Sequence, residues 1–146
     1  MQEYKRNCQD ELDWATIDQL HEATLQISNS CFEFKKICVG LIGVSLTVLV
    51  KLTDSEIGAS YFFIPLLICF GFWIADSSAY YFQRKNRIIM NEKIKEIANR
   101  NCIINYQTVV LEAKWHIAVF NYSMCLYYVL AAIGLVGWIM YSLLGK

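Results

Sequence analysis

The longest uncharged stretch of the chain limits its fold more than any other feature. Residues 117–144 read "IAVFNYSMCLYYVLAAIGLVGWIMYSLL" and contain no Asp, Glu, Lys or Arg. A helix of about 20 residues crosses the hydrocarbon core of a bilayer. A buried helix of a soluble domain would not run this far without a polar face. We therefore predict that residues 117–144 form a membrane-spanning helix.

Two further apolar stretches are typical of membrane helices. Residues 61–82 read "YFFIPLLICFGFWIADSSAYYF", with Pro65 in the first turns, where its missing N–H matters little. Residues 37–52 are shorter, and the lysines at both of their ends can extend toward the interfaces. A hydrophobic fraction of 56% in 146 residues agrees with one membrane domain. We predict an all-α membrane protein with three transmembrane helices and cytosolic helical extensions.

Basic residues near the ends of these segments predict their orientation. Lysine and arginine concentrate in residues 83–116, whereas residues 53–60 hold none, and such an imbalance places the basic side in the cytosol. The N-terminus is then cytosolic and the C-terminus outside. The predicted segments are a cytosolic amphipathic helix (1–36), a first span (37–52), an outer loop (53–60), a second span (61–82), a basic cytosolic helical loop (83–116) and a third span (117–144).

The N-terminal segment carries a heptad pattern. Apolar or small residues alternate at spacings of three and four at Ile17, Leu20, Thr24, Ile27, Cys31 and Phe34. One interpretation is a seam between copies of the chain, formed by Ile17, Leu20, Ile27 and Phe34. The other is a helix that packs on its own chain.

Asp76 is the only acidic residue inside a predicted span. An aspartate at the centre of a membrane helix costs about 2.5–3.5 kcal/mol on insertion scales, so its side chain should avoid lipid. It could face a water-filled pore and select cations, or pair across helices with Lys35 or Lys36. A polar ring would combine Asp76 with Ser77 and Asn121, and Ser45 would add weak polar lining in the first span.

The sequence lacks the usual signs of catalysis or metal binding. Its two histidines, His21 and His116, have no neighbouring nucleophile in a known arrangement, and its six cysteines form no C-x-x-C pair. We expect no enzyme, no cofactor and no metal. A net charge of zero also argues against a general nucleic-acid binder.

The basic residues after the second span have two interpretations. Arg84, Lys85, Arg87 and Lys93 could simply flank the membrane on its cytosolic side. Repeated around the axis of an oligomer, they could instead hold the phosphates of a nucleotide or oligonucleotide.

The end of the second span carries a family resemblance. In "FWIADSSAYYFQRKNR", Trp73, Asp76 and Tyr80 precede a basic cluster at 84–87. This segment resembles small bacterial membrane proteins of the SLATT type. The resemblance implies a pore-forming effector of an anti-phage system in the bacterial inner membrane, switched by a nucleotide signal or a partner enzyme. The third span departs from that pattern.

These observations together predict a homo-oligomeric membrane pore, gated through its cytosolic helices. Two alternatives remain. One is a holin-like permeabilising protein, and the other is a non-conducting anchor that recruits a soluble partner.

Overall fold

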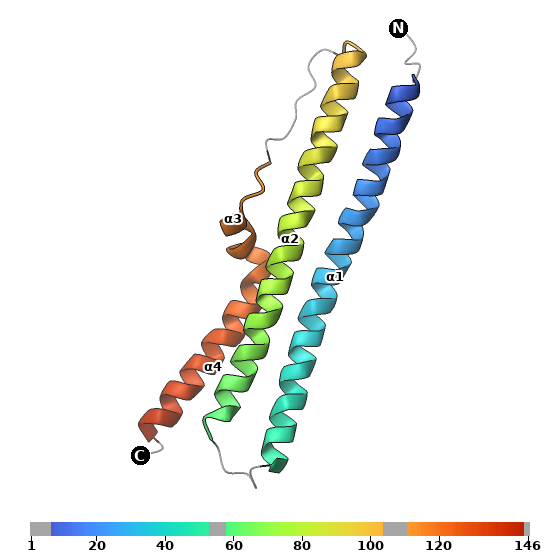
Figure 1. The fold of residues 1–146 in the computed structure, drawn as a ribbon. Coiled ribbons are helices and arrows are strands. Elements are labelled where there is room, and N and C mark those ends of the chain that lie inside the picture. Colours follow the sequence, from blue (N-terminus) through green and yellow to red (C-terminus); the bar gives the residue numbers. More distant parts are fainter. Residues whose placement is uncertain (1–6, 53–57, 104–110, 145–146) are drawn as a thin grey trace.

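The computed structural model describes residues 7–52, 58–103 and 111–144, and every regular element in these ranges is helical (Figure 1). The prediction of an all-α fold is therefore confirmed for this part of the chain. Most of the predicted outer loop, 53–57, lies outside the described residues, as do 1–6, 104–110 and 145–146. The elements in chain order are α1 (Cys8–Leu52), α2 (Ser60–Arg100), α3 (Trp115–Val119), the 3-10 turn η1 (Tyr122–Met124) and α4 (Cys125–Leu144).

Helices α1 and α2 form one long antiparallel hairpin, lying side by side along their length (Figure 1). They contain 45 and 41 residues, so each is about 60–70 Å long at a rise of about 1.5 Å per residue. A hydrocarbon core is about 30 Å thick. About half of each helix must therefore lie outside any membrane that the hairpin crosses.

A heptad pattern on both helices explains the hairpin. On α1 one seam position recurs every seven residues and is buried at each repeat: Asp10, Ile17, Thr24, Cys31 and Cys38. On α2 the matching positions are Cys69, Asp76, Gln83, Met90 and Ile97, all buried except the half-buried Met90. Such a repeat keeps one face of each helix against its partner. The two seams meet within one chain, where Phe34 contacts Phe72 with ring centroids 6.4 Å apart.

Local hydrogen bonds end both helices at the open end of the hairpin, where α1 begins and α2 ends. This end is called the tip below. At the start of α1, the Asn7 side chain accepts a hydrogen bond from the Asp10 N–H at 2.7 Å, a capping arrangement. At the end of α2, Cys102 has a φ of 50° and the Ile103 N–H donates to the Ala98 carbonyl at 3.0 Å. This is the Schellman arrangement, in which a left-handed residue ends a helix.

Helix α4 lies along α2 and uses its glycines for close contact. A Cβ at Gly137 would lie 2.9 Å from the Phe62 ring, and one at Gly134 would lie 3.1 Å from Leu66. Small residues at such contacts let two helices approach closely in lipid. Ring contacts of α2 with Trp138 and Tyr141 extend this interface.

Two helices of the described chain are long and apolar enough to cross a membrane. They are α2 and the segment Tyr122–Leu144, and only 17% and 11% of their most apolar windows are buried. Core helices of a soluble protein would be mostly buried. The predicted first span, 37–52, does not reach this length and composition, so three spans are not supported. Its apolar run is short because lysines bracket it at both ends.

The predicted continuous span over 117–144 is also wrong in one respect. The chain bends between α3 and η1, where Phe120 and Asn121 leave helical geometry. Asn121 has an extended backbone, which a residue with a short amide side chain readily adopts next to a helix start. The Tyr128 hydroxyl donates to the Val119 carbonyl at 2.6 Å and fixes the bend. The long apolar helix therefore begins at η1 rather than at Ile117.

Candidate functional site

An ion pair joins the three long helices near the middle of the hairpin. The Lys35 ammonium of α1 donates to Asp76 Oδ2 of α2 at 2.6 Å and to Ser123 Oγ of η1 at 3.3 Å. It also lies 5.9 Å from the ring centroid of Tyr127 in α4, within cation–π range. The Asp76 side chain is 0% exposed and that of Lys35 is 18% exposed. This junction is the candidate functional site.

Several polar atoms around the junction have no hydrogen-bond partner within the described residues. They are Asp76 Oδ1, Ser77 Oγ, the Tyr127 hydroxyl and Trp73 Nε1. A buried polar atom left unpaired costs about 1–3 kcal/mol. Four of the five such atoms in the described residues lie around this junction, which therefore needs an explanation beyond helix packing.

The geometry matches the interpretation in which Asp76 pairs with a lysine of the neighbouring helix. Lys35, one of the two lysines considered, contacts the carboxylate, whereas Lys36 pairs with Glu33 on the exposed surface at 2.7 Å. Within the described protomer, Asp76 faces neighbouring helices rather than an open conduit. Ser77 beside it is 1% exposed.

The other polar residues predicted for the site lie elsewhere. Asn121, which was predicted to join Asp76 and Ser77 in a polar ring, lies at the bend before η1. In this segment it is Ser123 that hydrogen-bonds to Lys35. The Ser45 hydroxyl donates to the Ile42 carbonyl of its own helix at 2.8 Å. Ser123 lies two residues after Asn121 in the same predicted span, and the sequence could not show which of the two contacts Lys35, because that depends on the bend.

The predicted seam residues serve the hairpin of one chain. Ile17 is buried, and Leu20, Ile27 and Phe34 are partly buried, in the face that α1 turns toward α2. The interpretation in which the helix packs on its own chain therefore describes this structure. The positions offered for a seam between copies are occupied by α2.

The four basic residues predicted to contact a ligand point to different neighbours. Arg84 donates to the Glu112 carbonyl at 2.9 Å and lies 5.9 Å from the Tyr80 ring. Lys93 pairs with Asp13 at 3.3 Å and Glu96 at 2.8 Å. Lys85 and Arg87 are exposed. The set does not converge on one binding site within the protomer.

A second ionic cluster closes the tip of the hairpin. The Arg100 guanidinium donates to Asp10 at 2.9 Å and also to Asp13, and the Asn101 amide donates to Asp10 at 3.2 Å. Burial raises the pKa of the Asp10 carboxyl, but the hydrogen bonds from Asn101 and Arg100 outweigh it and leave that pKa below its ordinary value. The hydrogen bond from Arg100 is the main cause that lowers the pKa of Asp13, and Lys93 adds to it. The sequence indicates that the acidic N-terminal segment and the basic residues 83–116 can pair by charge, but it does not indicate that Asp10 and Asp13, which continue the heptad spacing, meet Arg100.

Acid should open the tip before it unfolds the rest. Because the folded pKa values of Asp10 and Asp13 are lowered, their stabilisation is complete above the ordinary value of 3.8 and is lost as pH falls through the lowered values. Cys8 and Cys102 are exposed at the tip and can carry nitroxide labels once Cys125 is replaced by serine. Pulsed electron-electron double resonance should give a narrow distribution of distances between the two labels at pH 7. This distribution should broaden below about pH 4.

A double variant controls for other carboxylates. With Asp10→Asn and Asp13→Asn, the label distances should already be broad at pH 7 and change little with acid. An unchanged distribution in acid, or the same acid response in the double variant, would show that other groups hold the tip.

The described residues contain no group of three or more His, Cys, Asp or Glu side chains able to hold a metal ion. Comparison with known proteins gives no further identification. No family model, no curated protein and no solved structure matches the chain, so the resemblance to SLATT-type proteins rests on the residues quoted above alone.

Proposed function

We propose that this chain is a membrane effector subunit that assembles with copies of itself and opens an ion-conducting path when its cytosolic hairpin is displaced. The single observation that carries the proposal is the buried Lys35–Asp76 pair at the junction of three helices. Ionisable residues at membrane depth are expensive and mark functional sites by default.

Energetics explain why this pair argues for a switch. Replacing a buried ion pair by apolar residues is often neutral or stabilising, whereas removing one partner is strongly destabilising. A helix bundle that only had to remain in the membrane would gain nothing from Lys35 and Asp76. Breaking the Lys35–Asp76 pair would change the packing of α1, α2 and α4 together, as expected for a protein that switches between two conformations.

The proposed topology places the junction at the cytosolic boundary of the membrane. In the antiparallel hairpin, residues 37–52 of α1 lie beside the apolar half of α2, and they expose Ile37, Val44 and Val48 without a partner in the described chain. We therefore propose that this part of α1 also crosses the bilayer, with the N-terminus in the cytosol and the C-terminus outside. Aromatic side chains gather near the level of the junction, as they do at membrane interfaces: Trp73, Tyr80, Trp115, Tyr122 and Tyr128.

Assembly is required because one protomer cannot enclose a conduit. The charged groups at the junction, Lys35 and Asp76, face each other inside the helix packing, and the large side chains exposed on the membrane half are apolar. Around Gly40 and Gly43 of α1 there is open space where a neighbouring helix could approach. A ring of copies, in the bacterial inner membrane as the resemblance implies, would supply the missing walls.

The trigger would act on the cytosolic half of the hairpin. Lys85 and Arg87 are exposed there and could contact the phosphates of a nucleotide or oligonucleotide, or an acidic surface of a partner enzyme. Displacement of the hairpin would then be transmitted along α1 and α2 to the ion pair.

Dye release from liposomes tests the proposal. Purified protein would be reconstituted as wild type, as Lys35→Met, as Asp76→Asn and as the double variant Lys35→Met/Asp76→Leu. We expect little dye release from the wild type. Each single variant should release dye rapidly because the Lys35–Asp76 ion pair is broken. The double variant should release little, because apolar packing restores the closed state. Equal release from all four proteins would separate the ion pair from gating.

One observation favours a second candidate, the non-conducting anchor. Hydroxyls on the membrane half bond to carbonyls of their own helices, as Thr47 does to Gly43 at 2.9 Å and Ser142 to Ile139 at 2.9 Å. These side chains give the outer surface no hydrophilic stripe. If no variant releases dye and the cytosolic hairpin retains a soluble protein on membranes, the anchor function replaces the pore.

A further inference from the structure

Three buried sulfur-containing residues pack together where α1, α2 and the start of α4 meet. Cys38, Cys69 and Met124 form one cluster with Tyr127, and each of the four side chains is at most 3% exposed. Buried cysteine and methionine commonly serve as hydrophobic packing residues. Here three of the four members of the cluster carry sulfur, and their contacts point to a second role.

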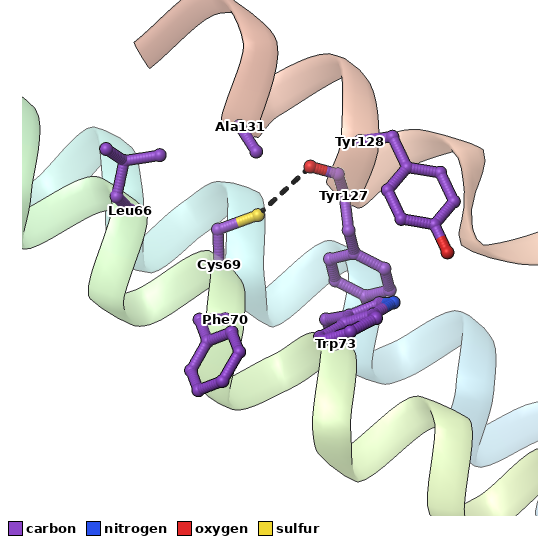
Figure 2. A pocket seen from close by; sticks show the side chains of 7 residues that line it. All are labelled: Leu66, Cys69, Phe70, Trp73, Tyr127, Tyr128 and Ala131. Carbon is purple, nitrogen blue, oxygen red and sulfur yellow. Dashed lines mark hydrogen bonds between the residues drawn. The ribbon is translucent and has the colours of Figure 1, made fainter. Parts of the chain in front are cut away.

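The two thiols of the cluster contact each other across the hairpin. Cys38 of α1 and Cys69 of α2 are hydrogen-bonded to each other through their side chains. The Cys69 thiol also donates to the Tyr127 carbonyl at 3.3 Å, the dashed line in Figure 2. Met124 precedes Tyr127 by three residues, so both side chains lie on the face of η1 and α4 that is buried against the hairpin. Three different elements therefore each contribute one sulfur atom to the cluster.

Sulfur donors of this kind select soft metal ions. Thiolate and thioether ligands favour Cu(I), whereas Zn²⁺ takes four ligands from cysteine, histidine and carboxylate side chains. The described residues hold no group of three such side chains, and the third donor of this cluster is a thioether. A methionine side chain has three rotatable bonds, so its sulfur can turn toward an ion held by the two thiols. The donor set therefore fits Cu(I) better than Zn²⁺.

The surroundings of the cluster favour an ion of low charge. The partly buried side chains packed against it are aliphatic or aromatic: Ile42, Ile68, Phe72, Trp73, Tyr80 and Leu130. The Lys35 ammonium lies against the Tyr127 ring, but Asp76 already balances its charge. A further net charge would be costly there. A monovalent cation that replaces one thiol proton leaves the total charge of the cluster unchanged.

A pocket on the side of the bundle reaches the cluster. Its volume is about 380 Å³, it lies between α2 and α4, and its lining includes both Cys69 and Tyr127 (Figure 2). A metal site needs an entry path as well as ligands. The pocket supplies one, because its wall is formed by a ligand residue of the cluster.

We propose that Cys38, Cys69 and Met124 bind a soft monovalent metal ion, Cu(I), in the core of the bundle. One thiol gives up its proton on binding and becomes the charged ligand, while the other thiol and the thioether are neutral donors. The ion would join α1, α2 and η1 one helical turn from Lys35 and stabilise their packing. This binding requires neither pore formation nor the Lys35–Asp76 pair.

Competition for Cu(I) with a chromophoric chelator tests the site. The whole chain would carry Cys8→Ser, Cys102→Ser and Cys125→Ser, which remove the three exposed thiols, and would be kept reduced in detergent. We expect this background protein to retain one Cu(I) per chain, with only sulfur atoms as near neighbours in X-ray absorption. Cys38→Ala and Cys69→Ala should each lose the bound copper.

Met124→Leu keeps the volume of the side chain and removes only the thioether, so it distinguishes ligand loss from misfolding. It should lower the affinity for Cu(I) at least about tenfold, since even loss of a residue that only supports a metal ligand has an effect of that size. X-ray absorption of this variant should show two sulfur neighbours instead of three.

Two matched variants control for other sulfur atoms. Met140 lies on α4 but is 51% exposed, and Cys31 is buried in the same seam one heptad before Cys38. Met140→Leu and Cys31→Ala should bind Cu(I) like the background protein. The proposal would be overturned if the background protein retains no copper, if Cys38→Ala and Cys69→Ala retain it fully, or if the two control variants lose it as well. Because the readout is bound copper, the result is independent of dye release from liposomes.

Discussion

Asp76→Ala should lower the free energy of unfolding by about 3–5 kcal/mol, the range measured when one partner of a buried ion pair is removed. The substitution leaves the Lys35 ammonium, with 18% of its side chain exposed, facing Ser123 and the Tyr127 ring without an anion. Unfolding by a denaturing detergent, followed by circular dichroism of the purified protein, measures the change. Lys35→Ala should have a similar effect, because it leaves the carboxylate buried alone.

Two further variants make this prediction specific. Glu33→Ala removes one partner of the exposed Lys36–Glu33 pair, whose side chains are 70% and 59% exposed, and should change the unfolding free energy by less than about 1 kcal/mol. The double variant Lys35→Met/Asp76→Leu should recover most of the lost stability, since apolar side chains of similar volume fill the same space. If Asp76→Ala has no larger effect than Glu33→Ala, water reaches the junction and the pair is not effectively buried.

The helical architecture followed from the sequence because the signals for it are local. Uncharged runs and heptad spacing predicted helices over nearly all of α1, α2 and α4. The same spacing also predicted which face of α1 is buried, since Thr24, Cys31 and Cys38 all lie in the seam. What spacing cannot reveal is the partner of a seam. A heptad face has the same pattern whether a second copy or the returning helix covers it, and here α2 covers it.

The bend before α4 shows a different limit. Residues 117–144 satisfy every local requirement of a continuous helix, and only tertiary contacts decide where it is interrupted. The hydrogen bond from Tyr128 to Val119 and the packing of α3 on α2 exist only after the helices have docked. The bend therefore brings Ser123, rather than Asn121, within hydrogen-bonding distance of Lys35. The sequence does not predict this change of direction.

The candidate site was partly predictable for the same reason. Asp76 was recognisable because a lone acid in an apolar helix must find a partner, and two lysines at similar depth were the available cations. The choice of Lys35 over Lys36 depends on which side of α1 faces α2. Opposite charges on the N-terminal segment and on residues 83–116 predicted that these segments can pair, but not which residues meet, because Asp10 and Asp13 look like ordinary solvent-exposed residues at a helix start. Their pairing with Arg100 follows only from the antiparallel register of two helices, 90 residues apart along the chain at Asp10 and Arg100.

Tyr127→Ala should lower the free energy of unfolding by about 3 kcal/mol, whereas Tyr127→Phe should leave it unchanged or slightly raised. The Tyr127 side chain fills the core between α1, α2 and α4 together with Cys38, Cys69 and Met124, and it is 2% exposed. Truncation to alanine leaves a cavity where three helices meet. The phenylalanine variant keeps the ring and removes a buried hydroxyl that has no partner within the described residues.

The adjacent Tyr128 provides the matched comparison. Its hydroxyl donates to the Val119 carbonyl at 2.6 Å, so Tyr128→Phe removes a made hydrogen bond and should cost about 1 kcal/mol. The two tyrosine-to-phenylalanine substitutions therefore differ in sign or size although the residues are neighbours, and detergent unfolding of both variants measures the difference. A loss of about 1 kcal/mol or more in Tyr127→Phe would contradict the prediction. It would mean that the Tyr127 hydroxyl bonds to the second oxygen of Asp76, directly or through water, and that the junction has more hydrogen bonds than the ion pair alone provides.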